Sequence, residues 1–187
     1  MKGVVFNLLE SAVSAAHGAD AWDDLLDAAS LSGAYTSLGN YDDAELEALL
    51  AAAVGSLGLQ RDEVLLWFGR QAMPALASAY PDFFTPHASA RPFVAGINDI
   101  IHAEVRKLYP GAACPHFGLF ETEAGGLIMR YMSPRRMCAL AEGFIHGAAD
   151  WYGETVDISH PRCVSHGDSH CELNVRWLAA SEHVHGA

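Results

Sequence analysis

Residues 116–135 read His-Phe-Gly-Leu-Phe-Glu-Thr-Glu-Ala-Gly-Gly-Leu-Ile-Met-Arg-Tyr-Met-Ser-Pro-Arg, and this stretch decides the type of fold. Two short apolar segments, His116 to Glu121 and Leu127 to Met132, flank the turn-forming run Ala124-Gly125-Gly126. Segments of this length on either side of a glycine-containing turn are typical of a β-hairpin. We therefore predict two antiparallel strands, which the rest of the chain has to cover.

The segments on either side of this hairpin predict helices and two more strands. After it, a helix is expected from about Arg136 to Tyr152, and strands at Thr155 to Ser159 and Cys171 to Trp177. Before it, apolar residues recur at helical spacing, at about 5–16, 22–29, 42–57, 62–79 and 92–109, with Pro74 expected to break or kink the fourth helix. This order predicts an α+β fold with a small antiparallel sheet. The tail 181–187 is expected to be frayed.

Composition excludes several classes of protein. The chain has 187 residues, 51% hydrophobic and 18% charged, with a net charge of −12. These values exclude a disordered chain, a collagen-like chain and a coiled coil. The acidic excess argues against nucleic-acid binding and against docking on an anionic membrane. No apolar run reaches the roughly 20 residues that span a bilayer, and Glu10 interrupts the short apolar start, so no signal peptide is predicted. We expect a cytoplasmic protein with reduced cysteines.

His102 lies within the predicted helix 92–109, directly after Ile100 and Ile101. It falls on or beside the apolar stripe of that helix. One interpretation is a core histidine with a single hydrogen bond, which is the commoner role of a lone histidine. The other is the proximal ligand of a haem, which needs a neutral imidazole on a rigid element in an apolar pocket. The residue alone does not decide between them.

Tyr131, Ser133 and Arg135 are spaced by two, so in an extended segment their side chains point the same way. Two hydroxyls and a guanidinium group can hold two adjacent carboxylates, such as the propionates of a haem. The alternative is a solvated strand end in which Ser133 caps the next helix. Without other observations this alternative is favoured, and Arg130 and Arg136 are further candidate cations.

Three cysteines and a histidine form a possible metal-binding set: Cys138, His160, Cys163 and Cys171. Three thiolates and one imidazole are a tetrahedral zinc set. Independent buried thiols explain the spacing equally well, and His166 and His170 are spare candidates for the imidazole. Cys114 has no evident partner and is read as a free thiol.

Three segments together resemble the haem-nitric oxide/oxygen-binding (H-NOX) domain family, which is related to the sensor domain of soluble guanylate cyclase. They are Met1-Lys2-Gly3-Val4-Val5-Phe6-Asn7-Leu8-Leu9-Glu10, Ile101-His102-Ala103-Glu104-Val105-Arg106-Lys107-Leu108-Tyr109-Pro110 and the Tyr-x-Ser-x-Arg pattern at Tyr131, Ser133 and Arg135. Each segment is modest alone, but three in register over the whole chain are specific. The chain resembles a bacterial stand-alone member of the family.

The resemblance implies haem b buried between a helical N-terminal subdomain (1–60) and a haem-ligating subdomain (61–180) of helices and a four-stranded antiparallel sheet. It implies that His102 is the proximal ligand of the haem iron and that Tyr131, Ser133 and Arg135 bind the propionates. Pro115 matches the family proline that presses on the haem. A subset of the family has a zinc site here, which favours structural Zn²⁺ on the four residues Cys138, His160, Cys163 and Cys171.

The distal side of the expected haem pocket departs from the oxygen-binding members. Those members carry a distal tyrosine where this chain has Leu140, and the helical neighbours Ala141 and Phe144 are no better as donors. The resemblance also places Val5 and Leu9 near the haem, and by alignment Leu9 and Pro74 at supporting distal positions. Bound dioxygen needs a hydrogen-bond donor, whereas nitric oxide needs one far less. Three nearby side chains could still donate a hydrogen bond to the bound gas or crowd it: Trp67, Phe68 and Tyr80.

These observations predict a haem-based nitric oxide sensor that discriminates against dioxygen, also binds CO, and has no catalytic activity of its own. The resemblance implies that it signals to a separate partner, a sensor histidine kinase or a cyclic-di-GMP cyclase or phosphodiesterase, through release of His102 and relaxation of the haem. The alternative is a zinc/thiol redox sensor that acts on the same partner. A haem enzyme such as a peroxidase is a weaker third reading, because no distal pair of His with Arg or Asn is present.

Overall fold

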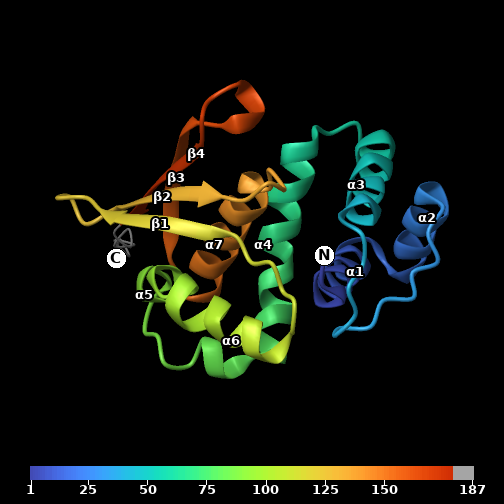
Figure 1. Cartoon of the computed structure of the whole chain (residues 1–187), viewed down its shortest axis with the longest axis horizontal. Helices are drawn as coiled ribbons and strands as arrows, with labels where there is room; N and C mark the ends of the chain where they lie inside the picture. Colours follow the sequence, from blue (N-terminus) through green and yellow to red (C-terminus); the bar gives the residue numbers. More distant parts are fainter. Residues whose placement is uncertain (179–187) are drawn as a thin grey trace, which may run out of the picture.

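The computed structural model describes residues 1–178, and the tail predicted to be frayed (181–187) lies outside the described residues. Three N-terminal helices occupy one side of the molecule and the sheet the other, with a long helix between them (Figure 1). The helices are α1 (Gly3–His17), α2 (Ala19–Ala29), α3 (Asp43–Leu57), α4 (Arg61–Ala79), α5 (Ala90–Ala95), α6 (His102–Leu108) and α7 (Cys138–Trp151). Shorter helical turns are η1 (Pro81–Phe83), η2 (Ile97–Ile101) and η3 (Val164–His166).

The sheet has four antiparallel strands in the order β1-β2-β4-β3. These are β1 (His116–Glu121), β2 (Leu127–Met132), β3 (Thr155–Arg162) and β4 (Cys171–Leu178). The predicted hairpin is β1–β2, and its bounds are those expected from the sequence. The register places Tyr131 of β2 opposite Phe117 on one side and opposite Cys171 on the other. The α+β class and the four-stranded antiparallel sheet are therefore confirmed.

Helices α4 and α7 cross at very close range because each carries glycine at the contact. A Cβ on Gly143 of α7 would lie 2.2 Å from the carbonyl oxygen of Leu66, and one on Gly69 of α4 would lie 2.4 Å from that of Leu140. Gly147 is also tight, at 2.7 Å from the carbonyl oxygen of Arg70. Backbones can approach to this extent only where a side chain is absent. The crossing fixes α7, which carries Cys138 and Leu140, against the central helix.

The segment predicted as one helix over 92–109 is divided in the structure. It consists of α5, the turn η2 and α6, and η2 is a π-turn in which the backbone N–H of His102 bonds to the carbonyl of Ile97, five residues earlier. Isolated π-turns within helices are rare and are often found at functional sites. The helical segment predicted over about 92–109 is therefore present, but its division at η2 was not predicted, because apolar periodicity does not reveal one extra residue in a turn.

Pro74 neither ends α4 nor faces the interior. The helix runs from Arg61 to Ala79 across it, and the Pro74 side chain is exposed in a shallow surface pocket beside Gln71 and Trp151. No helix in the part of the chain that the structure describes is long and apolar enough to span a membrane.

Candidate functional site

His102 is the first residue of α6, and its ring stacks on Phe117 of β1 with 5.7 Å between the ring centroids. Its Nδ1 is buried and has no hydrogen-bond partner among the described residues. Burial, together with the positive charge of Arg106, lowers the pKa of His102 to about 4, and the nearby backbone of Pro115 opposes this shift. The imidazole is therefore neutral at physiological pH. A neutral, half-buried imidazole with an unpartnered, buried nitrogen fits the ligand of a haem iron.

Tyr131 lies in a buried row of side chains on the inner face of the sheet. Its ring is 5.7 Å from that of Phe117, its strand neighbour on the other side is Cys171, and all three side chains are buried. The Tyr131 hydroxyl accepts a hydrogen bond from the backbone N–H of Met137 at 3.3 Å. The row therefore runs from the residue that stacks on His102 to the strand that carries Cys171.

Ser133 and Arg135 follow β2 in the turn that leads to α7. The Ser133 hydroxyl accepts a hydrogen bond from the backbone N–H of Arg135 at 3.3 Å. The Arg135 guanidinium binds the Asp43 carboxylate at 2.7 Å and the carbonyl oxygen of Ala113 at 2.6 Å. Arg135 thus already holds one carboxylate, the kind of group that a propionate would present, and it contacts the chain two residues before Pro115.

The alternative in which Ser133 caps the following helix is wrong. Helix α7 begins only at Cys138, and Met137 occupies the N-cap without a side-chain hydrogen bond. Between Ser133 and Met137, Arg136 has a left-handed backbone, with φ of 54°. This conformation directs the chain away from a helix that would start at Ser133.

The side chains expected on the distal side are apolar. Leu140 on α7 and Leu9 on α1 are buried, with exposed fractions of 9% and 3%. Phe144 is partly buried, and its ring centroid lies 6.4 Å from that of Phe68 on α4. Val5 packs against the same core.

Three further residues that were considered for the distal side lie elsewhere or are already engaged. The assignment of Pro74 to the distal wall is wrong, because α4 turns this residue to the surface. The Tyr80 hydroxyl is hydrogen-bonded to the hydroxyl of Tyr109. The ring of Trp67 lies 5.8 Å from that of His17 on α1.

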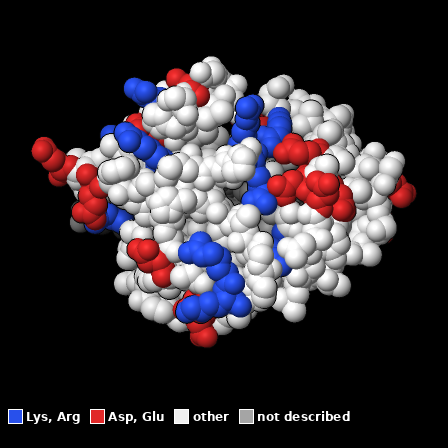
Figure 2. Space-filling view, in the orientation of Figure 1, with Lys and Arg blue, Asp and Glu red and all other residues white. Residues whose placement is uncertain are grey.

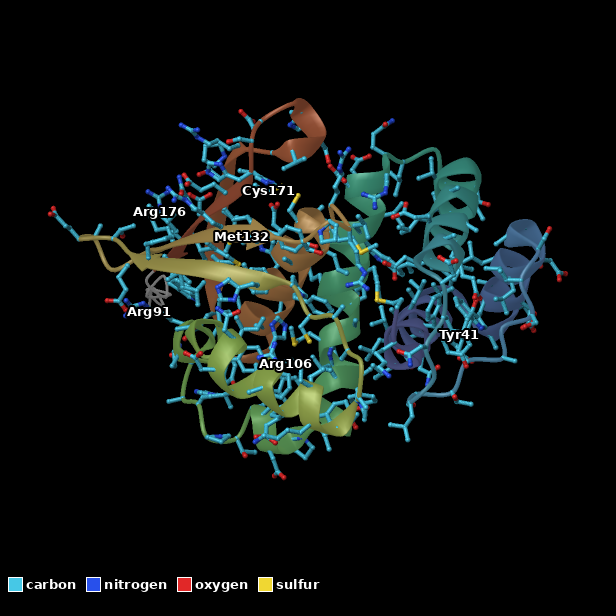
Figure 3. The ribbon with its side chains drawn as sticks, in the orientation of Figure 1. Tyr41, Arg91, Arg106, Met132, Cys171 and Arg176 are labelled. Atoms are coloured by element: carbon cyan, nitrogen blue, oxygen red, sulfur yellow. The ribbon has the colours of Figure 1, made fainter. Side chains whose placement is uncertain are left out.

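The four residues of the possible metal-binding set are brought together. The Sγ of Cys163 lies 3.6 Å from that of Cys138 and 4.0 Å from that of Cys171, and one ring nitrogen of His160 completes a group of ligand atoms within 4.8 Å of one another. These sulfur separations are too long for a disulfide bond of about 2.05 Å. They suit ligands about 2.3 Å from a shared tetrahedral zinc ion. Figure 3 shows the Cys171 sulfur beside the start of α7.

Glu142 of α7 orients the histidine of this set. Its carboxylate lies 3.5 Å from Nδ1 of His160, whose Nε2 is buried and has no partner in the described part of the chain. A carboxylate on one nitrogen leaves the other as the ligand atom. The spare candidates His166 and His170 are outside the group, as is the half-buried Cys114.

The sequence analysis did not single out Phe117, Glu142, Asn98 or Asp43. Asp43 at the start of α3 binds Arg135, 92 residues away. Figure 2 shows acidic side chains over α3 next to basic ones. No local sequence pattern predicts a contact between residues so far apart. The position of Asn98 could have been noticed, because a residue four positions before His102 lies beside His102 on a helix.

The fold is α+β, and a half-buried, neutral histidine stacks against its four-stranded sheet; these features fit a haem-binding sensor domain. The family model described as Haem-NO-binding matches residues 2–160, and the chain belongs to this family of haem-based gas sensors.

Solved H-NOX structures are similar over nearly the whole chain. An H-NOX protein from Shewanella oneidensis in the Fe(II)NO state has 33% identity and a TM-score of 0.89, covering 96% of this chain and 100% of that one. An H-NOX domain of the same organism in the Fe(II)CO state also has 33% identity over 96% and 100% of the two chains, with a TM-score of 0.86. An unliganded Fe(II) H-NOX mutant from K. algicida has 26% identity and a TM-score of 0.84 over 97% and 98%.

Proposed function

We propose that the chain holds haem b through His102 and senses nitric oxide. The observation that carries this proposal is the neutral, half-buried imidazole of His102, whose buried Nδ1 has no partner among the described residues. When bound, the haem would supply a ferrous iron that coordinates a diatomic gas. Tyr131, Ser133 and Arg135 would hold its propionates, and Pro115 would press on its ring. Relatives of known structure carry NO or CO.

Selection against dioxygen follows from the apolar distal side chains. Leu140, Phe144 and Leu9 offer no N–H or O–H group, whereas bound dioxygen is polar and depends on a donor. Nitric oxide and CO depend on one far less. A site that withholds a hydrogen bond therefore rejects the ligand that needs it.

Signalling would begin with release of His102 from the metal. The His102 ring would then be held only by its stacking on Phe117, and α6 could shift. The N-terminal subdomain (1–60), with Val5 and Leu9 near the haem, would move relative to the haem-ligating subdomain (61–180). This is a two-state element that a ligand biases. The signal passes to a separate effector, a sensor histidine kinase or a cyclic-di-GMP cyclase or phosphodiesterase.

An absorption spectrum of the reduced protein tests the proposal. We expect five-coordinate ferrous haem that binds nitric oxide and CO and forms no detectable complex with dioxygen. A His102→Gly variant supplied with imidazole should retain haem and act on the effector as the nitric oxide complex does. Absence of haem from the wild-type protein, or a variant that acts as the unliganded protein, overturns it.

The cluster of Cys138, His160, Cys163 and Cys171 supports a second candidate function, a zinc/thiol redox sensor. In its reduced form it holds Zn²⁺, which braces β4 against α7. Hydrogen peroxide would take two electrons from two thiolates, forming one disulfide and two water molecules and releasing the zinc. Zinc loss on peroxide treatment, with a changed action on the effector and an unchanged response to nitric oxide, would favour this candidate.

A further inference from the structure

The side chain of Asn98 binds the backbone of a single residue in the sheet. Its Nδ2 donates to the carbonyl oxygen of Phe117 at 2.6 Å, and its Oδ1 accepts from the N–H of Phe117 at 3.2 Å. Because β1 is an edge strand, these two backbone groups point away from β2, where another strand would otherwise pair with them. Asn98 therefore takes the place of a neighbouring strand at one residue.

Asn98 is also part of the π-turn that positions His102. It is the second residue of η2, and the turn closes on the backbone N–H of His102 itself. A one-residue change of register in a helix rotates everything that follows by about 100°. The register of η2 thus decides where the His102 ring points. The π-turn is a less regular arrangement than an α-turn, and Asn98 is its side-chain attachment to the sheet.

The same strand residue contacts both Asn98 and His102. Phe117 receives the two hydrogen bonds on its backbone and stacks its ring on the imidazole. The segment 90–109 has three other polar attachments to the rest of the described chain: the Ala90 N–H to Glu154 at 3.1 Å, Arg91 to Glu121 at 3.0 Å, and Tyr109 to Tyr80. Figure 3 labels Arg91 near the start of the segment and Arg106 near its end, with β1 running alongside. All three attachments are at its ends, and none involves Phe117.

We propose that Asn98 is a positioning residue for the proximal ligand: it fixes the π-turn to β1 and so holds the His102 ring against Phe117. This inference rests on the proposed haem ligation. Its consequence is that Asn98 sets how readily the bond between His102 and the iron breaks when a gas molecule binds on the other side. A looser clamp favours release, and therefore lowers the ligand occupancy needed for the signal.

Two substitutions of graded effect test the clamp. Asn98→Ala removes both hydrogen bonds, whereas Asn98→Asp keeps the acceptor for the Phe117 N–H and places negative charge against the Phe117 carbonyl. Lys107→Ala is the matched control, because Lys107 is on α6, the helix that begins at His102, is 68% exposed and binds only Glu104 in the described structure. The readouts are the iron–histidine stretching frequency of the ferrous protein, the ratio of five- to six-coordinate haem in the nitric oxide complex, and amide hydrogen exchange at Phe117 in haem-free protein.

For Asn98→Ala we expect a lower stretching frequency and a shift of about tenfold toward five-coordinate haem, consistent with the loss of two ordinary hydrogen bonds. Asn98→Asp should shift the stretching frequency and the coordination ratio in the same direction. Lys107→Ala should change neither of these two readouts. Without haem, exchange at the Phe117 amide should quicken in Asn98→Ala, which removes its acceptor, and should change less in Asn98→Asp, which keeps one. The clamp is therefore tested even if the wild type binds no haem.

For Asn98→Ala, an unchanged stretching frequency and coordination with haem retained, or unchanged exchange at the Phe117 amide, would overturn the inference. If the Asn98 variants lose haem, an unchanged melting temperature of the haem-free protein supports positioning. If instead the melting temperature of the haem-free variants falls together with their haem affinity, Asn98 has a folding role only and the inference is overturned.

Discussion

The chemistry of the candidate site depends on a few side chains whose environments differ sharply. His102 is neutral because burial disfavours its charged form, whereas His160 has its pKa raised by Glu142 despite its own partial burial. His102 is neutral and has a buried, unpartnered ring nitrogen, which suits a ligand of haem iron. His160 has a ring nitrogen among three thiols, which suits a ligand of zinc.

Leu140 is the residue at which the proposed gas selectivity can be tested directly. Leu140→Tyr introduces a hydroxyl on the distal side, and a hydrogen bond to bound dioxygen should raise dioxygen affinity by about 10–100-fold. Absorption spectra of the reduced protein in air measure this. Leu140→Phe is the control, since it adds the ring without the hydroxyl. A tyrosine variant without any detectable dioxygen complex would contradict the proposed pocket.

Cys138 tests the metal-binding set. Cys138→Ala should lose most of its zinc, because three ligands hold the ion far less tightly than four, and metal analysis of the purified protein checks this. Cys114→Ala should keep its zinc, since Cys114 is a free thiol outside the group. Stoichiometric zinc in the Cys138 variant would exclude this cysteine as a ligand.

At the scale of elements, the crossing of α4 and α7 is the contact that determines where both candidate sites lie. Helix α7 carries Cys138 at its start and Leu140 and Phe144 in its first half. Gly69 and Gly143 let the two backbones approach until a methyl group no longer fits. The distal wall and the thiol cluster therefore share one rigidly seated helix.

Gly143→Ala should destabilise the protein strongly, because its Cβ would lie 2.2 Å from the carbonyl oxygen of Leu66. Overpacking of this kind costs about 3 kcal/mol, and a melting temperature lower by about 6–12 °C follows for a domain of this size. Thermal unfolding followed by circular dichroism measures it. Gly55→Ala in α3, where nothing lies within 4 Å, should be neutral or stabilise by up to about 1 kcal/mol. Equal melting temperatures for both variants would refute the close crossing.

Regular elements could be predicted from the sequence, whereas irregular backbone could not. The bounds of β1 and β2 follow from apolar segments and a glycine turn, and α1, α3 and β4 follow from periodicity. The π-turn before His102 leaves the apolar pattern unchanged. Arg136 has a left-handed backbone, which its residue type does not predict, because arginine rarely adopts this conformation. For the same reason the start of α7 was placed two residues early.

At the scale of the whole molecule, the residues of the candidate site could be named, but only some of their partners could. The grouping of Cys138, His160, Cys163 and Cys171 is the structural outcome that the sequence predicted best, although spacing alone left zinc and independent thiols equally open. The carboxylate on Arg135 comes from Asp43, 92 residues away. Long-range pairs depend on how the N-terminal helices pack against the rest, which no local pattern encodes.

The ion pair between Asp43 and Arg135 joins the N-terminal helices to the turn before α7, and its contribution should depend on pH. Partial burial alone would raise the pKa of Asp43, but hydrogen bonds from the terminal ammonium group and Arg135 hold it below the usual value of 3.8. A carboxyl group with a lowered pKa stabilises the fold at neutral pH, and this stabilisation disappears as pH falls through the folded-state pKa. Because Asp43 is 42% exposed, the pair is worth only about 0.5–1 kcal/mol.

Asp43→Asn should therefore lower the free energy of unfolding by that amount at pH 7 and make no difference well below pH 3. Urea unfolding between pH 7 and pH 2.5 measures it. Asp42→Asn is the matched control, because Asp42 caps α3 through the N–H of Ala44, asparagine caps equally well, and Asp42 makes no contact with Arg135 among the hydrogen bonds described. If the two variants lose equal stability at pH 7, the ion pair does not join the two parts of the molecule. A deficit confined to Asp43→Asn that closes as the pH falls shows that the Asp43 carboxylate, which binds both the terminal ammonium group at 2.6 Å and Arg135 at 2.7 Å, connects the N-terminal helices to the residue proposed to hold a propionate.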